Sequence, residues 1–194
     1  MKIDIGRVDI PNDQNKHTDL FSTILKCNNS ENFGGDDAFM YIVEELIDNV
    51  YQHSQFLNGS FAAKVSESEG VADLAVFDNG ITIRRRFLES GLFFDQDSEA
   101  IVRAVNGLSS KDEPGRGFGL GSSVKLVIDG FGGEMFIASG SGAVYASKDS
   151  QERYNFGVER LDGTLVALRV PLPCPLVDVY SYVECHLPTD KYNT

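Results

Sequence analysis

Cysteine is scarce in this sequence of 194 residues. The three that occur, Cys27, Cys174 and Cys185, follow no repeated spacing. An odd, unpatterned set of cysteines gives no indication of a disulfide framework or of a zinc site. A reduced, cytoplasmic setting is therefore expected.

Long apolar runs are also missing. No stretch reaches the run of about 18 apolar residues that a membrane-spanning helix needs. Residues 1–10 lack the apolar core of a signal peptide. No association with a membrane is expected from these features.

Positive charge is the third shortage: 17 Lys and Arg stand against 29 Asp and Glu, for a formal net charge of −12. This balance disfavours binding to nucleic acid or to an anionic membrane surface. It does not exclude a nucleotide ligand, because local dipoles and a metal ion can outweigh the global charge.

The patterns that are present predict a single globular domain with a substantial core. Strands are expected over residues 1–10, 60–65, 71–77, 134–138, 144–147, 153–159 and 164–170. Helices are expected over residues 18–26, 36–55, 84–90, 98–106 and 120–128. This order predicts an α+β fold, a two-layer sandwich of a mixed sheet with helices on one face.

Prolines mark the end of the predicted core. Pro171, Pro173 and Pro175 cannot extend a central strand. The domain is therefore expected to span residues 1–171. Residues 172–194 are expected to be an extension, either an edge strand over 177–185 or a tail.

Polar residues interrupt the otherwise apolar helix expected over 36–55. Glu45 and Asn49 are four residues apart, so they share one face of that helix. An amide oxygen is a suitable ligand for Mg²⁺, and a carboxylate can deprotonate a water or hydroxyl. The alternative is a solvated helix face.

Asp78, Asn79 and Gly80 stand at the end of a predicted strand. A buried carboxylate there can accept a hydrogen bond from an exocyclic amine, which selects adenine over guanine. Gly80 would let the base lie close to the backbone. The alternative, an Asn-Gly hairpin turn, is disfavoured because residues 84–86 are three arginines rather than a strand.

Four glycines alternate with other residues over 115–121 and lead directly into a helical pattern. Such a loop lets an anion approach backbone N–H groups and the positive end of the helix dipole. The spacing fits neither the P-loop nor the dinucleotide-binding fingerprint. Alone it is equally compatible with a glycine-rich turn.

These segments, in this order, resemble the GHKL (Bergerat-fold) ATPase family, which includes gyrase-type ATPases and histidine kinases. Residues 45–49 resemble its asparagine box, 78–80 its first glycine box, and 117–121 its second. Gly163 and Thr164 resemble its final glycine-threonine motif. The resemblance covers residues 36–171 and implies the Bergerat ATP-binding fold, with ATP and Mg²⁺ as cofactors.

The resemblance also implies roles for single residues. Asn49 would ligate Mg²⁺, Asp78 would bind the adenine amine, and Lys111 or Arg116 would meet the γ-phosphate. Residues 87–114 would form a lid over the nucleotide. The expected nucleotide-binding residues are Asn49, His53, Asp78, Gly80, Lys111, Arg116, Gly117, Phe118, Gly119, Leu120, Gly121 and Thr164. A solvated loop charge for Lys111 and a structural histidine for His53 remain alternatives.

Two departures from the family pattern bear on function. Thr82 replaces the second glycine of the first glycine box, which leaves the geometry of the lid open. Glu45 occupies a position where sensor kinases often have Asn. ATP-hydrolysing members and the anti-sigma-factor serine kinases have Glu there as the general base.

The function expected from the resemblance is a stand-alone ATPase or protein kinase, nearest in type to the anti-sigma-factor serine kinases, with Glu45 as catalytic base. A protein partner or substrate is implied, and a homodimer stays open. One alternative is a nucleotide-dependent switch with little turnover. Another, a detached histidine kinase catalytic domain, is disfavoured because His17 and His186 lack a phosphoacceptor context.

Overall fold

The computed structural model describes residues 2–10, 36–66, 68–108 and 119–182. Its strands are, in chain order, β1 (Lys2–Ile10), β2 (Gly59–Ser66), β3 (Val71–Asp78), β4 (Glu134–Gly140), β5 (Gly142–Ala146), β6 (Gln151–Asn155) and β7 (Leu161–Pro171). Each lies where alternation of the sequence predicts a strand, within a few residues at the ends. The helix expected over 18–26 lies outside the described residues.

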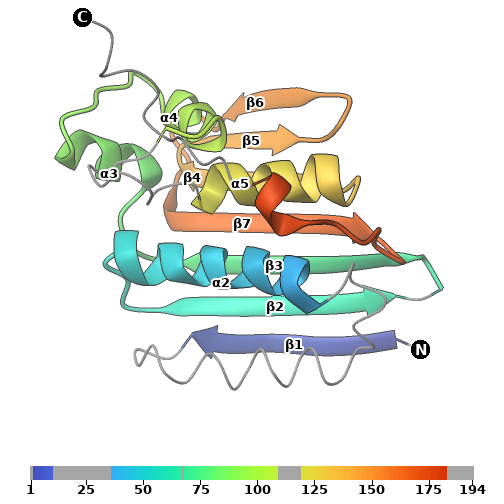
Figure 1. Cartoon of the computed structure of the whole chain (residues 1–194). Helices are drawn as coiled ribbons and strands as arrows, with labels where there is room; N and C mark the ends of the chain where they lie inside the picture. Colours follow the sequence, from blue (N-terminus) through green and yellow to red (C-terminus); the bar gives the residue numbers. More distant parts are fainter. Residues whose placement is uncertain (1, 11–35, 67, 109–118, 183–194) are drawn as a thin grey trace, which may run out of the picture.

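All seven strands form one sheet, in the order β1-β2-β3-β7-β4-β5-β6 (Figure 1). Every pairing between the described strands is antiparallel, so the expectation of a mixed sheet was wrong. The reason is the place of β7. After the long connection that follows β3, β4 runs parallel to β3. β7 lies between these two strands and pairs antiparallel with both.

The helices form a second layer against one face of the sheet, as expected (Figure 1). They are α2 (Asp36–His53), α3 (Ile83–Glu89), α4 (Asp97–Val105) and α5 (Gly119–Lys125), which continues as a π-helical turn, η3 (Leu126–Gly130). The architecture is therefore a two-layer α+β sandwich with an open sheet.

The core lies between the two layers. The apolar face of α2 is buried and consists of Phe39, Ile42, Val43, Leu46, Ile47 and Val50. It packs on alternate residues of the inner sheet face, including Leu74 and Val76 of β3 and Leu168 of β7. Apolar residues at helical spacing in α2 and at alternate positions in the strands thus form one apolar layer.

Residues 172–182, the described part of the segment after β7, do not add an edge strand. Residues 179–181 form a short 3-10 helix, η4 (Val179–Ser181), which begins where the Asp178 carboxylate accepts a hydrogen bond from the Tyr180 N–H. Tyr182 packs near Gly130 on the helix layer. Of the two alternatives for this extension, the edge strand is not formed by residues 177–182, because an Asp-initiated turn and core contacts fold the chain onto the helices.

Candidate functional site

The inner face of the sheet changes from apolar to polar at one end. Val76, Val166 and Ile137 are aligned across β3, β7 and β4. Two residues further along the inner face, the aligned residues are Asp78, Thr164 and Ser139. Because these residues share a face by strand alternation, one carboxylate and two hydroxyl groups lie side by side.

A cavity of about 130 Å³ lies over this polar row, between the sheet and the ends of the helices. Its walls include Leu46, Asn49, Val50 and His53, which fall on one face of α2 by helical spacing. The other lining residues are Ser54, Val76, Asp78, Ile81, Thr82, Ile83, Arg86, Phe87, Ala104, Leu108, Leu120, Gly121, Thr164 and Val166. A mostly apolar cavity with a few convergent polar groups is typical of a small-molecule site.

Asp78 is the buried acid of the cavity, with 4% of its surface exposed. The Gly80 N–H donates a hydrogen bond of 2.8 Å to its carboxylate. Desolvation raises the pKa of Asp78 to about 6, although the hydrogen bonds from Gly80 and Ser54 act in the opposite direction. The Ser54 hydroxyl also lies 2.7 Å from the Val50 carbonyl, so its single proton can serve either acceptor. Asp78 is thus ionised at neutral pH, at an energetic cost to the fold.

Two glycines allow the chain to crowd around Asp78. A Cβ on Gly80 would lie 1.9 Å from the Ser54 carbonyl oxygen. Gly163 has φ +100°, and a Cβ there would lie 1.9 Å from the Asp78 carbonyl oxygen. Gly80 is not among the cavity-lining residues, in contrast to its expected place under the base. Its visible contributions are close packing against the end of α2 and the hydrogen bond to Asp78.

Two members of the polar row, Ser139 and Thr164, are joined by a hydrogen bond. The Ser139 and Thr164 hydroxyl oxygens are 2.9 Å apart, and Ser139 also lies 3.1 Å from the Gly163 carbonyl. The Ile83 N–H donates to the Ser139 hydroxyl at 3.0 Å, which ties the start of α3 to the sheet. Thr164 therefore lies at the cavity wall with its hydroxyl held by Ser139 rather than by bulk water.

The two expected site residues at the end of α2 reach the cavity, and the expected base does not. Asn49 and His53 both line it. Glu45 is partly buried and is not a lining residue. Its charge contributes to raising the pKa of Tyr41, after desolvation, and the Tyr41 hydroxyl is hydrogen-bonded to Ser122 of α5. Glu45 thus lies toward the contact between α2 and α5.

The glycine run is only partly described. Gly119 begins α5, and Leu120 and Gly121 line the cavity. A Cβ on Gly121 would lie 3.1 Å from Gly107 Cα, so this glycine also permits close approach to the end of α4. Four expected nucleotide-binding residues, Lys111, Arg116, Gly117 and Phe118, lie outside the described residues.

Thr82 and Arg86 contribute in ways that the sequence pattern did not reveal. Thr82 is the N-cap of α3, and its hydroxyl accepts a hydrogen bond from the Arg85 N–H at 3.2 Å. Its φ of −73° requires no glycine, which explains why a threonine is tolerated there. Arg86 is one of the residues that line the cavity. The arginine run at 84–86 was its only signal in the sequence.

The residues present fit a magnesium ion that arrives with a phosphate ligand. Among the described residues, no group of three His, Cys, Asp or Glu side chains is placed to hold a metal by itself. Mg²⁺ in nucleotide sites is commonly bound by one or two protein oxygens together with substrate phosphates. Asn49, whose side chain is at the cavity, can provide such an oxygen.

A scan against protein-family models and a search of curated proteins gave no match for this chain. Within the described ranges, no helix has the length and apolar character required to cross a membrane.

Proposed function

We propose that this protein is a Mg-ATP-binding domain of the GHKL type with a Bergerat-like fold. The observation that carries the proposal is convergence on one cavity. Asn49, Asp78, Gly121 and Thr164 come from four separate segments, and all line the same space. Each segment is one of the four motifs on which the resemblance rests. Unrelated turns and caps have no physical reason to meet at one cavity.

The cavity suits the base of the nucleotide. The buried Asp78 carboxylate is an acceptor for the exocyclic amine of adenine, and the Thr164 hydroxyl lies next to it in register. Val76 and Val166 offer apolar contact to the faces of the ring. A volume of about 130 Å³ is suited to a base rather than to a whole nucleotide. The triphosphate would therefore extend toward Asn49 and the glycine run.

In the catalytic form of the proposal, Glu45 is the general base. It would take a proton from the water or hydroxyl that attacks the γ-phosphate, and Asn49 would supply an oxygen to the magnesium ion between the phosphates. The bound metal would neutralise charge on the phosphate oxygens. A protein serine or threonine is the proposed acceptor if the group is transferred rather than hydrolysed.

A second candidate function is a nucleotide-dependent switch with little turnover. The position of Glu45 favours it, because this carboxylate is near Tyr41 and is not a lining residue of the cavity. In a switch, ATP would shift the population of two conformations through contacts that differ between them. No proton transfer by Glu45 is then needed.

Binding is tested by Asp78→Asn, with Asp73→Asn as the matched control. Both aspartates are on β3, but Asp73 is on the outer face, where it pairs with Arg169. Loss of a charge-assisted hydrogen bond should weaken Mg-ATP binding by about 1–3 kcal/mol in Asp78→Asn. Asp73→Asn should bind like the wild type. Isothermal titration calorimetry measures both, and equal affinity of Asp78→Asn and wild type would exclude this adenine site.

Turnover separates the two candidate functions. In the catalytic form, Glu45→Ala should lower the rate of phosphate release from Mg-ATP by about 10²- to 10⁴-fold, the usual contribution of a general base. Glu44→Ala, which changes an exposed neighbour on the same helix, should leave the rate unchanged. A wild-type protein that binds Mg-ATP without turnover, alone or with an added protein acceptor, would instead support the switch.

A further inference from the structure

The outer face of the sheet, which is turned away from the helices, has an apolar centre. One row across β2, β3, β7 and β4 consists of three alanines and a phenylalanine: Ala62, Ala75, Ala167 and Phe136. The next row across the same strands consists of Ser60, Phe77, Leu165 and Ala138. The described helices all lie against the opposite face (Figure 1). The open face of an antiparallel sheet is usually polar, so these apolar rows indicate a partner surface.

A row of charged residues borders the apolar rows. Lys64, Asp73, Arg169 and Glu134 are aligned across the same four strands, so their charges alternate in sign. The Arg169 Nε lies 2.6 Å from the Asp73 carboxylate, and the Lys64 Nζ lies 3.8 Å from a Glu69 carboxylate oxygen. The row is neutral, whereas the whole chain has a formal net charge of −12. A second copy of this acidic chain therefore meets no net repulsion along this row.

The alternating row is complementary to itself in one orientation of two facing sheets. A two-fold axis that is parallel to the strands and passes between β3 and β7 reverses the strand order of the facing sheet. Lys64 of one protomer then faces Glu134 of the other, and Asp73 faces Arg169. A two-fold axis across the strands would set each charge against its own copy. The charges thus select the first orientation.

The apolar rows are compatible with the same orientation. With the strand order reversed, Phe136 of one protomer faces Ala62 of the other, so a large side chain meets a small one. In the next row, Phe77 faces Leu165. Two sheets that pack face to face lie about 10 Å apart and interdigitate their side chains in this way.

We propose that this outer face is a homodimer interface, in which two copies pack sheet on sheet about a two-fold axis parallel to the strands and between β3 and β7. The apolar rows form the centre of the interface. The charged row lies at their margin, where charges fix the orientation of the partner more than they add affinity. The candidate nucleotide cavity is on the other face of the sheet and stays accessible in this dimer.

Charge reversal at the two outer positions of the row tests the orientation. Lys64→Glu would set two carboxylates against each other across the axis, and Glu134→Lys would set two ammonium groups against each other. Symmetry makes each clash occur twice, so each variant should raise the dimer Kd by at least about tenfold. The double variant restores opposite charges across the axis and should return the Kd toward that of the wild type.

Recovery in the double variant would not come from a contact within one protomer. Lys64 and Glu134 are on β2 and β4, which are three strand spacings apart, roughly 14 Å. Arg103→Glu is the matched control, because it makes the same charge change as Lys64→Glu on an exposed residue of α4 in the helix layer. Its dimer Kd should equal that of the wild type.

Sedimentation equilibrium at physiological salt measures each Kd, after circular dichroism has shown that the variants fold alike. The expected result is a wild-type dimer that both single reversals weaken and the double reversal recovers. A wild-type protein that stays monomeric at every concentration would overturn the proposal. So would single variants that dimerise like the wild type, or a double variant as weak as the singles.

Discussion

The two faces of the sheet carry hollows of opposite character. The inner cavity measures about 130 Å³, whereas a shallow groove on the outer face measures about 360 Å³. The outer groove has a floor of alanines on β2, β3 and β7, with Phe136 and Tyr145 beside it. The outer groove is the less enclosed of the two and faces away from the helix layer.

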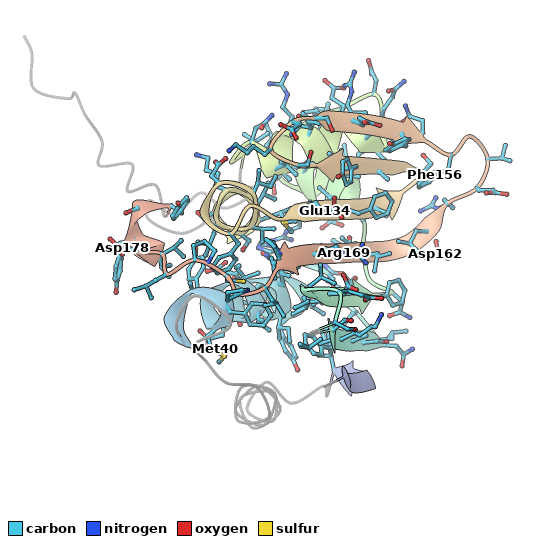
Figure 2. All side chains as sticks on the ribbon, turned by 90° about the vertical axis from the view of Figure 1, so that its right-hand side faces the viewer. Met40, Glu134, Phe156, Asp162, Arg169 and Asp178 are labelled. Atoms are coloured by element: carbon cyan, nitrogen blue, oxygen red, sulfur yellow. The ribbon has the colours of Figure 1, made fainter. Side chains whose placement is uncertain are left out.

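The charged groups of the outer face satisfy one another. Lys64, Asp73, Arg169 and Glu134 are aligned across four strands and alternate in sign. Arg169 Nε is 2.6 Å from Asp73 Oδ1, and Glu134 accepts a hydrogen bond from Tyr145 at 2.5 Å. Glu134 and Arg169 lie on adjoining strands in Figure 2. Cross-strand pairing explains this row without a ligand.

On the inner face, by contrast, Asp78 is desolvated and the Arg86 Nε is buried without a partner in the described residues. The two faces thus differ in whether the polar groups have partners within the protein. What distinguishes a binding cavity is polar capacity that the protein itself leaves unused.

The largest effect is expected from Gly163→Ala. A Cβ at this position meets the Asp78 carbonyl at 1.9 Å, and φ is +100°. Gly157→Ala is the control, because Gly157 also has a positive φ, +67°, but has nothing within 4 Å of the added carbon. The control should cost about 1 kcal/mol in stability and Gly163→Ala more than about 4 kcal/mol. Urea unfolding measures both, and equal costs would contradict the crowding around Asp78.

A smaller effect, of opposite sign, is expected from Asp78→Asn. The pKa of Asp78 is raised from 3.8 to about 6 in the fold. A carboxyl with a raised pKa favours folding below pH 3.8, and that advantage is lost as the pH rises through about 6. Asn removes the cost of the buried charge and still accepts the Gly80 hydrogen bond. Above pH 7 the variant should be more stable than the wild type, by on the order of 3 kcal/mol.

The difference in stability between Asp78→Asn and wild type should disappear near pH 4, where Asp78 is protonated in the fold.

The smallest effect is expected from Asp73→Asn on the outer face, a loss of at most about 1 kcal/mol in stability, because its ion pair is partly exposed. Thermal unfolding followed across the pH range measures both variants. A wild type as stable as Asp78→Asn at pH 8 would mean that the Asp78 charge is well solvated.

Elements with strong local patterns could be predicted from the sequence. The helical spacing of apolar residues in α2 and the alternation of apolar residues in β3 each indicate an element that is buried on one side. The structure confirms both. The antiparallel sheet could not be predicted, because β7 pairs with β3 and β4, which are distant from it in the sequence. The residue pattern within a strand does not indicate which distant strand it will pair with.

The candidate site divides in the same way. Asn49, Asp78 and Thr164 were named from motifs, and the structure brings them to one cavity. Arg86 was missed because a run of three arginines is ordinarily a solvated helix face, and only the turn of α3 directs one of them inward. Gly80 was assigned to the base, although its close contact is with the Ser54 carbonyl. Which neighbour a glycine accommodates depends on tertiary packing.

The position of β7 has a consequence for assembly. Among the described strands, this one is the last in the chain, and it alone lies between β1-β2-β3 and β4-β5-β6 in the sheet. The hairpins within each half can form from local contacts. The two halves can pair into one sheet only after residues 161–171 have been synthesised. Thr164 arrives with that strand and meets Asp78 of the other half. A ligand bound to both residues would connect β3 to β7. Ligand binding would then stabilise the pairing of these two strands, and the pairing would in turn favour ligand binding.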